Sequence, residues 1–421
     1  MAAHWISNSR RALQRLGFLK PAVGVAGPAR TRAQMTDELS AVVTKLIRVR
    51  GDTSLTSWIA SKRGSLQASS VGDEIELETQ AYLLYRYRAR SGWLSPKGVE
   101  EYVEVLPRRL ALLDEVFRPT EAGMILHQVL VAPDERSSWR EGSDLGPNPM
   151  ELTPGQRYFI AHSILAADGD FLIPWIGALQ TRFGGRSFGY LEAGSEIPAI
   201  LGEVASTFEP VAYQASDRRQ LDALRAAGAK IEEEITSKKH LEGSGSRREQ
   251  TSVPRLEWLV DLGILDRLNT EALDYRFTQA GEHAVRELTV AYQDALAHRY
   301  ADAALQAVLD ASFARAFRLI LDPAGRRDAE QGSEAQKGID IVDYLRPAYR
   351  EIDSISGYCL LRTLNLLAAI TAVRSGQREL IEYAKAVELL EGAYRREPGR
   401  LHYTTDRLST DLQVRLSAGG M

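Results

Sequence analysis

Apolar side chains recur every three or four positions through the second half of the chain, a spacing that predicts amphipathic helices. Between residues 283 and 321 the repeat is formed by Leu288, Tyr292, Leu296, Tyr300, Leu305, Leu309, Phe313, Phe317 and Leu321. Further helices are predicted near 340–350, 356–374 and 378–396. The last two are joined by a short Ser-Gly-Gln link, so they should form an antiparallel pair. The pattern indicates a mainly α fold.

The period of the pattern shortens to two residues near the C-terminal end. Leu401 and Tyr403 alternate with polar residues, as do Leu412, Val414 and Leu416. Alternation of this kind, in two short runs separated by a polar segment, is typical of paired strands. The chain is therefore predicted to end in a β-hairpin.

Polar stretches interrupt the apolar pattern and predict boundaries. Residues 132–153 are rich in proline and glycine, which indicates a domain boundary. Residues 322–338 lack aromatic and β-branched side chains and are predicted to form a flexible loop. Residues 241–250 contain Gly-Ser-Gly-Ser beside two arginines and are interpreted as a loop within a domain.

One short pattern occurs twice. Phe117–Gly123 and Tyr275–Gly281 share an aromatic residue, Arg, Thr, Ala and Gly at matching positions. Each lies downstream of a predicted helix end, Ser91–Leu94 and Leu262–Leu265, and a third such end is Leu16–Leu19. The glycine can adopt the left-handed conformation that ends a helix, and the threonine can cap the next helix. The predicted order is helix, strand, turn, strand, helix.

This order resembles the winged helix-turn-helix superfamily, best over residues 216–288 and more loosely over 1–130. In the first copy an inserted helix, 97–113, is predicted to fill a longer gap. The resemblance implies a mainly α fold with small β wings, in which winged-helix-like modules are joined by helical segments. The predicted domains are 1–131 (an N-terminal basic winged-helix-like module with inserted helices), 150–215 (a helical connector), 216–288 (a winged-helix module) and 289–421 (a helical C-terminal bundle with the terminal β-hairpin and the loop 322–338).

The resemblance also implies where DNA would bind. In the better copy the helix 255–262, starting at Ser252 with Pro254 just inside, takes the recognition position, and residues 266–275 form the wing. The predicted DNA contacts are Arg10, Arg11, Arg15, Lys20, Lys238, Lys239, Arg247, Arg248, Arg255 and Arg267. Acidic residues such as Glu257 lie on the same predicted surface and would repel phosphate, so the N-terminal cluster is favoured as the phosphate-binding end.

The charge is unevenly distributed. The chain has 52 basic and 56 acidic side chains, a net charge of −4. The first 50 residues hold nine basic and two acidic residues, a charge of +7, which leaves −11 for the rest. Arginine suits phosphate binding, although a GC-rich genome also enriches arginine. The first 36 residues contain no Asp or Glu. A basic arm or an organellar transit peptide would explain this, and so would a gene start assigned too early if translation begins at Met35.

Composition and motifs exclude several classes of protein. The single cysteine, Cys359, cannot form a disulfide within the chain, so a reducing, cytoplasmic location is expected. Phosphate-binding loops, dinucleotide fingerprints and nucleophile elbows are missing from the sequence. Asp168–Asp170 is interpreted as a turn between two helices rather than a cation loop. The apolar stretch 357–373 contains Arg362 and Asn365 and is interpreted as a buried helix. No catalytic residue, cofactor, metal site or membrane contact is predicted.

The sequence leads to two hypotheses. The first is a non-enzymatic DNA-binding subunit that contacts duplex DNA mainly through phosphates and recruits or regulates a partner enzyme, in a bacterial DNA-transaction or anti-phage defence system. The alternative is a structural adaptor whose winged helices dock other proteins. The apolar helices between 356 and 396 need cover, so a protein partner or self-association through 339–421 is also expected. An enzyme with an unfamiliar site is a third reading.

Overall fold

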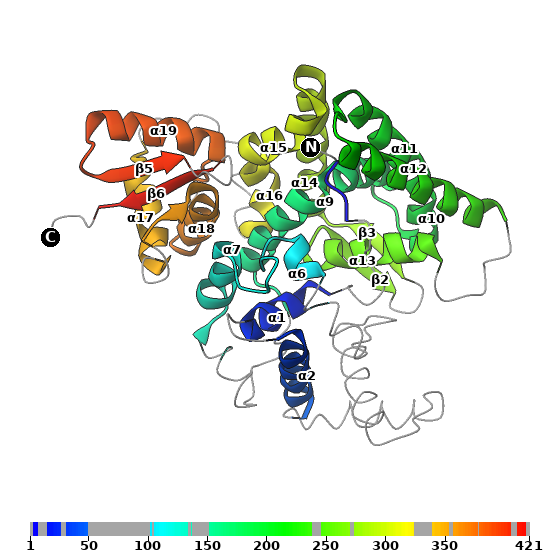
Figure 1. The fold of residues 1–421 in the computed structure, drawn as a ribbon, viewed down its shortest axis with the longest axis horizontal. Coiled ribbons are helices and arrows are strands. Elements are labelled where there is room, and N and C mark those ends of the chain that lie inside the picture. The colour runs from blue at the N-terminus through cyan, green and yellow to red at the C-terminus, as the bar shows by residue number, and fades with distance from the viewer. Residues whose placement is uncertain are drawn as a thin grey trace.

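The computed structural model describes residues 3–6, 15–26, 31–48, 102, 105–133, 136, 151–237, 246–269, 273–323, 339–352, 357–377, 379–405 and 411–417 (Figure 1). The described chain is mainly helical and contains two small antiparallel sheets of three strands each. This confirms the predicted mainly α fold with small β elements. Below, the C-terminal unit means residues 339–417, and the core means the described residues that precede it.

The N-terminal elements are η1 (Leu16–Phe18), α1 (Leu19–Val25), α2 (Arg32–Arg48), α6 (Leu106–Arg109), α7 (Glu121–Ile125) and the π-helical turn η3 (Leu126–Leu130). Of these elements, α2 lies lowest in Figure 1, α1 lies above it, and α6 and α7 lie above α1. The predicted helix end at 16–19 is wrong, because η1 runs directly into α1 and so begins a helix. Of the described residues within the predicted inserted helix 97–113, Tyr102 and the four residues of α6 are helical, and 110–113 are not.

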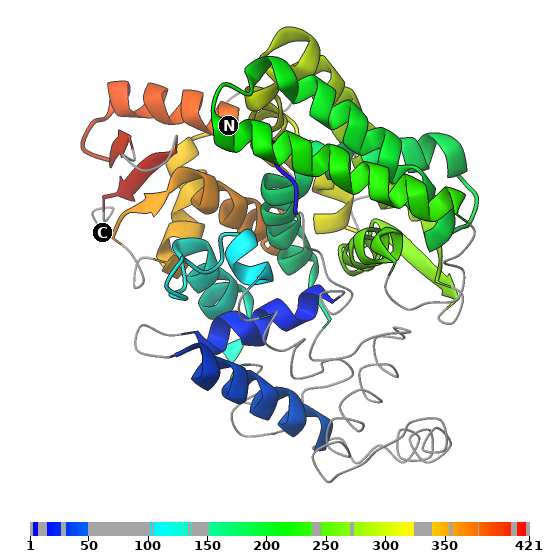
Figure 2. The same ribbon diagram turned by 45° about the vertical axis from the view of Figure 1, so that its right-hand side comes forward.

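A long helix, α9, passes through the middle of the core (Figure 2). Against it pack α11 (Ile197–Phe208), α14 (Gln279–His298), α15 (Ala301–Ala311) and α16 (Phe313–Leu321). Helix α12 (Ala215–Thr236) packs on α11 and on α13 (Arg247–Asp261), α10 (Tyr190–Ser195) packs on α13, and the turn η4 (Glu209–Val211) follows α11. Helix α9 (Pro154–Phe183) is capped by Thr153, which forms a reciprocal capping box with Gln156. By length and composition α9 alone among the described helices could span a membrane, but most of its apolar window is buried within the protein.

The turn predicted at Asp168–Asp170 is wrong, since α9 continues through it. A Cβ at Gly169 would meet the side chain of Leu305, so glycine lets α15 cross close to α9. The two aspartates point into the core, where they accept hydrogen bonds from the N-terminal segment. The two buried carboxylates therefore bind backbone N–H groups and do not lie in a solvent-exposed turn.

The core sheet has the strand order β1-β3-β2, with β1 (Phe188–Gly189), β2 (Leu265–Asn269) and β3 (Asp274–Phe277) all antiparallel. Strands β2 and β3 form the predicted hairpin. Strand β1 comes from the predicted connector 150–215, so the sheet joins two segments that were predicted to be separate domains. Helix α13 begins at Ser246, whose side chain accepts the Glu249 N–H. The predicted start at Ser252 is therefore wrong, because an earlier serine already caps the helix.

The C-terminal unit contains α17 (Ile341–Ile352), β4 (Cys359–Leu360), α18 (Leu361–Arg374), α19 (Tyr383–Arg396), β5 (Leu401–Thr405) and β6 (Leu412–Leu416). The predicted terminal hairpin is confirmed in β5 and β6. Strand β4 joins the far side of β6, so the sheet order β4-β6-β5 repeats that of the core sheet. Leu364, Leu367 and Leu390 are buried within the chain, which removes the sequence-based reason for expecting a partner to cover these helices.

A hydrogen-bonded latch closes the hairpin of the core sheet. Gly263 ends α13 with a φ of +77°, as predicted, and the Ile264 N–H bonds back to the Leu259 carbonyl. At the far end of the hairpin, the Thr278 hydroxyl donates to the Gly263 carbonyl at 2.7 Å and its N–H donates to Ile264 at 3.0 Å. Thr278 also caps α14, as predicted. A Cβ on Gly281 would collide with the Ile264 carbonyl oxygen.

The same latch recurs at the N-terminal repeat. The Thr120 hydroxyl donates to the Ala111 carbonyl at 2.6 Å, and its N–H donates to Leu112 at 3.1 Å. Ala111 has a left-handed φ of +53°, and a Cβ on Gly123 would collide with the Leu112 carbonyl oxygen. The helix end that matches Leu262–Leu265 is therefore 110–113, and the predicted match at 91–94 lies outside the described residues.

A third latch closes the C-terminal hairpin. The Ser417 hydroxyl donates to the Gly399 carbonyl at 2.6 Å, and its N–H donates to the Arg400 carbonyl at 2.9 Å. In sequence Ser417 is followed three residues later by Gly420, as Thr120 is by Gly123 and Thr278 by Gly281. The chain thus uses one local device three times behind a helix end, to close its two hairpins and the turn that carries the isolated Leu113–Pro119 bridge.

Candidate functional site

The structure buries four of the ten predicted DNA contacts. These are Arg15, Lys20, Arg255 and Arg267, each of which lies among core side chains with polar partners. Arg247 and Arg248 begin α13, where their backbone N–H groups donate to the Glu234 carboxylate. The other four, Arg10, Arg11, Lys238 and Lys239, lie outside the described residues.

Arg255 is held by a bidentate ion pair inside the core. Its Nε and Nη2 atoms lie 2.7 and 2.9 Å from the two oxygens of Asp168, and both side chains are fully buried. The guanidinium also donates to the Ile6 carbonyl and lies over the Phe171 ring. A buried charge requires such pairing, which leaves no donor for a phosphate. The expectation that Arg255 contacts DNA is corrected accordingly.

Glu257 organises a second buried cluster on α13. It pairs with Arg15 at 3.0 Å and with Arg267, and it accepts the Tyr275 hydroxyl at 2.6 Å. Arg15 also pairs with Asp261 at 2.5 Å. Burial lowers the pKa of Arg267 to about 10, so its guanidinium stays charged at neutral pH. The carboxylates that were expected to repel DNA instead neutralise arginines within the fold.

The N-terminal segment forms a strap over α9 and α13. The His4 and Ile6 N–H groups each donate to a buried carboxylate of α9, Asp170 and Asp168, at 2.7 Å. Burial raises the pKa of both aspartates, and the hydrogen bonds from the strap oppose that rise. Lys20 of α1 is also held by the core, because its ammonium donates to the Glu151 carbonyl at 3.0 Å. Helix α13, the predicted recognition helix, is consequently enclosed by protein.

Helix α19 precedes the C-terminal hairpin as α13 precedes the core hairpin, but α19 has a different environment. It buries only one stripe, formed by Tyr383, Ala386, Leu390 and Ala393. Val387 and Leu389 are half-buried against buried side chains, whereas Ala384, Glu388 and the last turn from Tyr394 to Arg396 are exposed, and the Arg395 side chain is 80% exposed. In both views α19 runs along the outer side of the C-terminal unit (Figures 1 and 2). Sequence analysis expected a protein partner or self-association here and placed no DNA contact, because it interpreted the region as a helical bundle. Ser417, followed by Gly420 as Thr278 is by Gly281, is the signal in the sequence that could have shown the likeness of this hairpin to the core hairpin.

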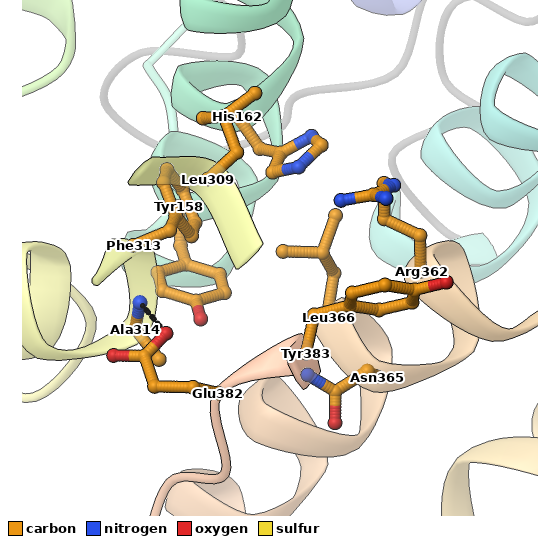
Figure 3. Close-up of a pocket in the computed structure, with 10 residues that line it drawn as sticks. All are labelled: Tyr158, His162, Leu309, Phe313, Ala314, Arg362, Asn365, Leu366, Glu382 and Tyr383. Carbon is orange, nitrogen blue, oxygen red and sulfur yellow. Dashed lines mark hydrogen bonds between the residues drawn. The ribbon is translucent and has the colours of Figure 1, made fainter. Parts of the chain in front are cut away.

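A small pocket lies where the core meets the C-terminal unit (Figure 3). Side chains from α9, α15, α16, α18 and the start of α19 line it. They are Tyr158, His162, Leu309, Phe313, Ala314, Arg362, Asn365, Leu366, Glu382 and Tyr383. The space inside has room for about one water molecule. It is therefore too small for an organic substrate.

The polar groups of this pocket join the two parts of the chain. Glu382 accepts the backbone N–H groups of Ala314 at 2.9 Å and Arg315 at 2.8 Å, at the start of α16. Arg362 pairs with Asp310 of α15 and lies over the Tyr383 ring. Each of these groups is committed to a contact that holds the C-terminal unit against the core.

The pocket's only histidine is not placed for acid–base chemistry. Burial, with a smaller effect of the Arg362 cation, lowers the pKa of His162 to about 3. The ring is therefore neutral at physiological pH and packs edge-to-face against the Phe313 ring. Within the described ranges, no three His, Cys, Asp or Glu side chains are grouped so as to hold a metal ion. Cys359 is buried in β4, as expected for a core residue.

Glu121 forms another link between the core and the C-terminal unit. Its carboxylate accepts the Leu360 N–H at 2.9 Å, at the end of β4. Burial raises the pKa of Glu121 to about 7, and the hydrogen bond from Leu360 opposes that rise. The protonation state of this contact consequently changes near neutral pH.

Comparison of the chain with protein-family models, with curated proteins and with solved structures finds no match in any of the three.

Proposed function

We propose that this chain is a non-enzymatic DNA-binding subunit built from winged-helix-like units. In the C-terminal unit, helix, strand, two helices and two strands follow one another, and the strands pair in the order first, third, second. Helix-turn-helix proteins place the second helix of such a pair in the major groove. The observation that carries the proposal is that this order occurs twice in the chain, once around each sheet.

The unit around the core sheet has the same order, with α9, β1, α10, α13, β2 and β3 in the corresponding places. Helices α11 and α12 are inserted between α10 and α13. Because α13 is enclosed, we assign this unit a scaffolding role. Recruitment of a partner enzyme, in a bacterial DNA-transaction or anti-phage defence system, stays a prediction, as do the cytoplasmic location and self-association through 339–421.

The charge of the C-terminal unit favours a second candidate, a structural adaptor that docks proteins. Residues 339–421 contain 11 basic and 11 acidic side chains, a net charge of zero. On α19, Lys385 lies 2.8 Å from Glu388, and Arg395 lies 3.7 Å from Glu391. A balanced surface attracts phosphate less strongly than a basic one and suits a polar protein interface.

Duplex-DNA binding at two salt concentrations separates the two candidates. The purified chain would be titrated against a fluorescent duplex in about 50 mM and about 200 mM salt. Phosphate-mediated binding should be present at the lower concentration and weaken at the higher one, because bound counterions are released. Failure to bind at low salt would reject the DNA-binding function and leave the adaptor.

A further inference from the structure

The structure distinguishes the two helices that stand in the recognition position. Helix α13 is buried over Ser252–Leu259, and its cations are bound to Asp168, Glu257 and Asp261. Helix α19 buries Tyr383, Ala386, Leu390 and Ala393, half-buries Val387 and Leu389, and exposes Ala384, Glu388 and its last turn from Tyr394 to Arg396. If a winged-helix unit of this chain reads DNA, α19 has the accessible face and α13 does not.

We infer that duplex DNA contacts the chain at the corner where α19 passes into the C-terminal hairpin, through Arg395, Arg396 and Arg415. This inference rests on the proposed DNA-binding function and assigns the DNA contact to one surface of the C-terminal unit.

Exposed cations from two elements gather at this corner. Arg395 and Arg396 form the last turn of α19, only a few residues before β5 begins at Leu401. Arg415 of β6 lies directly opposite His402 of β5 in the antiparallel register, near the same end of the hairpin. All four side chains are exposed. The end of the helix and the adjoining end of the hairpin therefore each carry exposed positive charge.

The three arginines are available to phosphate. Arg396 and Arg415 pair with no carboxylate of the described residues, although the Arg415 guanidinium lies over the Tyr358 ring. Arg395 forms a loose ion pair with Glu391, 3.7 Å away and beyond hydrogen-bond distance. Arg400 stands beside them but is bound to Asp340, Asp343 and Glu397, so it is not among the contacts. None of the three is held by a buried carboxylate, and exposed guanidinium groups can bind phosphate oxygens bidentately.

The number of cations sets the expected salt dependence. Three phosphate contacts give a slope of about −2.7 for the logarithm of the binding constant against the logarithm of salt concentration. The acidic cluster around Arg400 makes a larger slope unexpected. Replacing two of the three arginines should reduce the slope to about −0.9.

The test compares two double variants of the full chain in the same titration. R395A/R396A removes the corner cations, and R218A/R219A removes two exposed arginines on α12 as the matched control. The inference predicts that R395A/R396A lowers affinity at low salt and flattens the salt slope, while the control leaves both unchanged. R415A alone should reduce the slope by about 0.9, and far-ultraviolet circular dichroism should show all variants folded.

Two results would overturn the inference and differ in what they say of the proposed function. Salt-dependent binding by the wild-type chain that R395A/R396A and R415A leave unchanged would show that DNA binds elsewhere, with the DNA-binding function intact. A wild-type chain that does not bind duplex at low salt would reject both the location and the DNA-binding function.

Discussion

Single residues fix the latches, and glycine is needed where a backbone carbonyl leaves no room for a side chain. Gly281 and Gly123 each lie against the carbonyl that their neighbouring threonine also binds. The sequence repeat made both glycines and both threonines visible, and the predicted caps at Thr278 and Gly263 are confirmed. These features were predictable because each depends on a few neighbours in sequence.

Gly281→Ala should destabilise the protein by about 1–3 kcal/mol, because the new methyl group must displace the Ile264 carbonyl. Gly263→Val should cost about 1 kcal/mol or more, because a β-branched residue disfavours the left-handed φ. Chemical denaturation of each variant measures the free energy of unfolding. Gly202→Ala is the control, since Gly202 has open space around it and alanine should be neutral or stabilising. An equal loss in all three variants would contradict the latch.

Glu121 predicts a pH dependence of stability. Its folded pKa of about 7 lies above the unfolded value of 4.5, so the folded state binds the proton more tightly. The contribution of Glu121 is therefore most favourable below about pH 4.5 and is lost as the pH rises through 7. Allowing for the partial exposure of the carboxyl group, the loss is about 1–2 kcal/mol.

Glu121→Gln keeps an oxygen that can accept the Leu360 N–H but cannot ionise. The variant should match the wild-type protein near pH 5 and exceed its free energy of unfolding at pH 8. Urea denaturation at the two pH values measures the difference. A variant that is less stable than the wild-type protein at pH 8 would show that ionised Glu121 stabilises the joint.

At the scale of elements, sequence analysis succeeded with hairpins and failed where distant segments decide. Helix α9 was predicted to break at Asp168, but residues 3–6 and Arg255 give that carboxylate its partners. Helix α13 was predicted to start at Ser252, although Ser246 caps it. The burial of Arg15 and Arg255 was likewise invisible, because arginine in a local pattern looks the same on a surface and in a core. Charge counts along the chain thus placed four buried side chains among the predicted DNA contacts.

The Arg255–Asp168 pair should hold α13 to α9. Arg255→Leu removes the cation and leaves the Asp168 carboxylate buried, which typically costs about 3–5 kcal/mol. Thermal and urea unfolding measure this loss, and Arg247→Ala, at the exposed start of the same helix, is the control that should change stability by less than about 0.5 kcal/mol. Wild-type stability in Arg255→Leu would mean that the pair does not anchor the helix.

At the scale of the whole molecule, one strand order built twice gives two units with different surroundings. The core unit is closed by the N-terminal strap, while the C-terminal unit stands at one end of the molecule with α19 outward (Figure 1). Sequence analysis identified the hairpin of each unit but not the third strand, because β1 and β4 are only two residues long. It therefore assigned to two domains the segments that the core sheet joins.

Amide hydrogen exchange of the full chain, with and without a saturating duplex DNA at low salt, tests the central claim most directly. We expect slower exchange in the last turns of α19 and in β5 and β6, with α13 unchanged because it is already enclosed. Protection confined to α13 or to the core surface, or no protection anywhere on adding DNA, would contradict the assignment of the C-terminal unit as the DNA-contacting part of this protein.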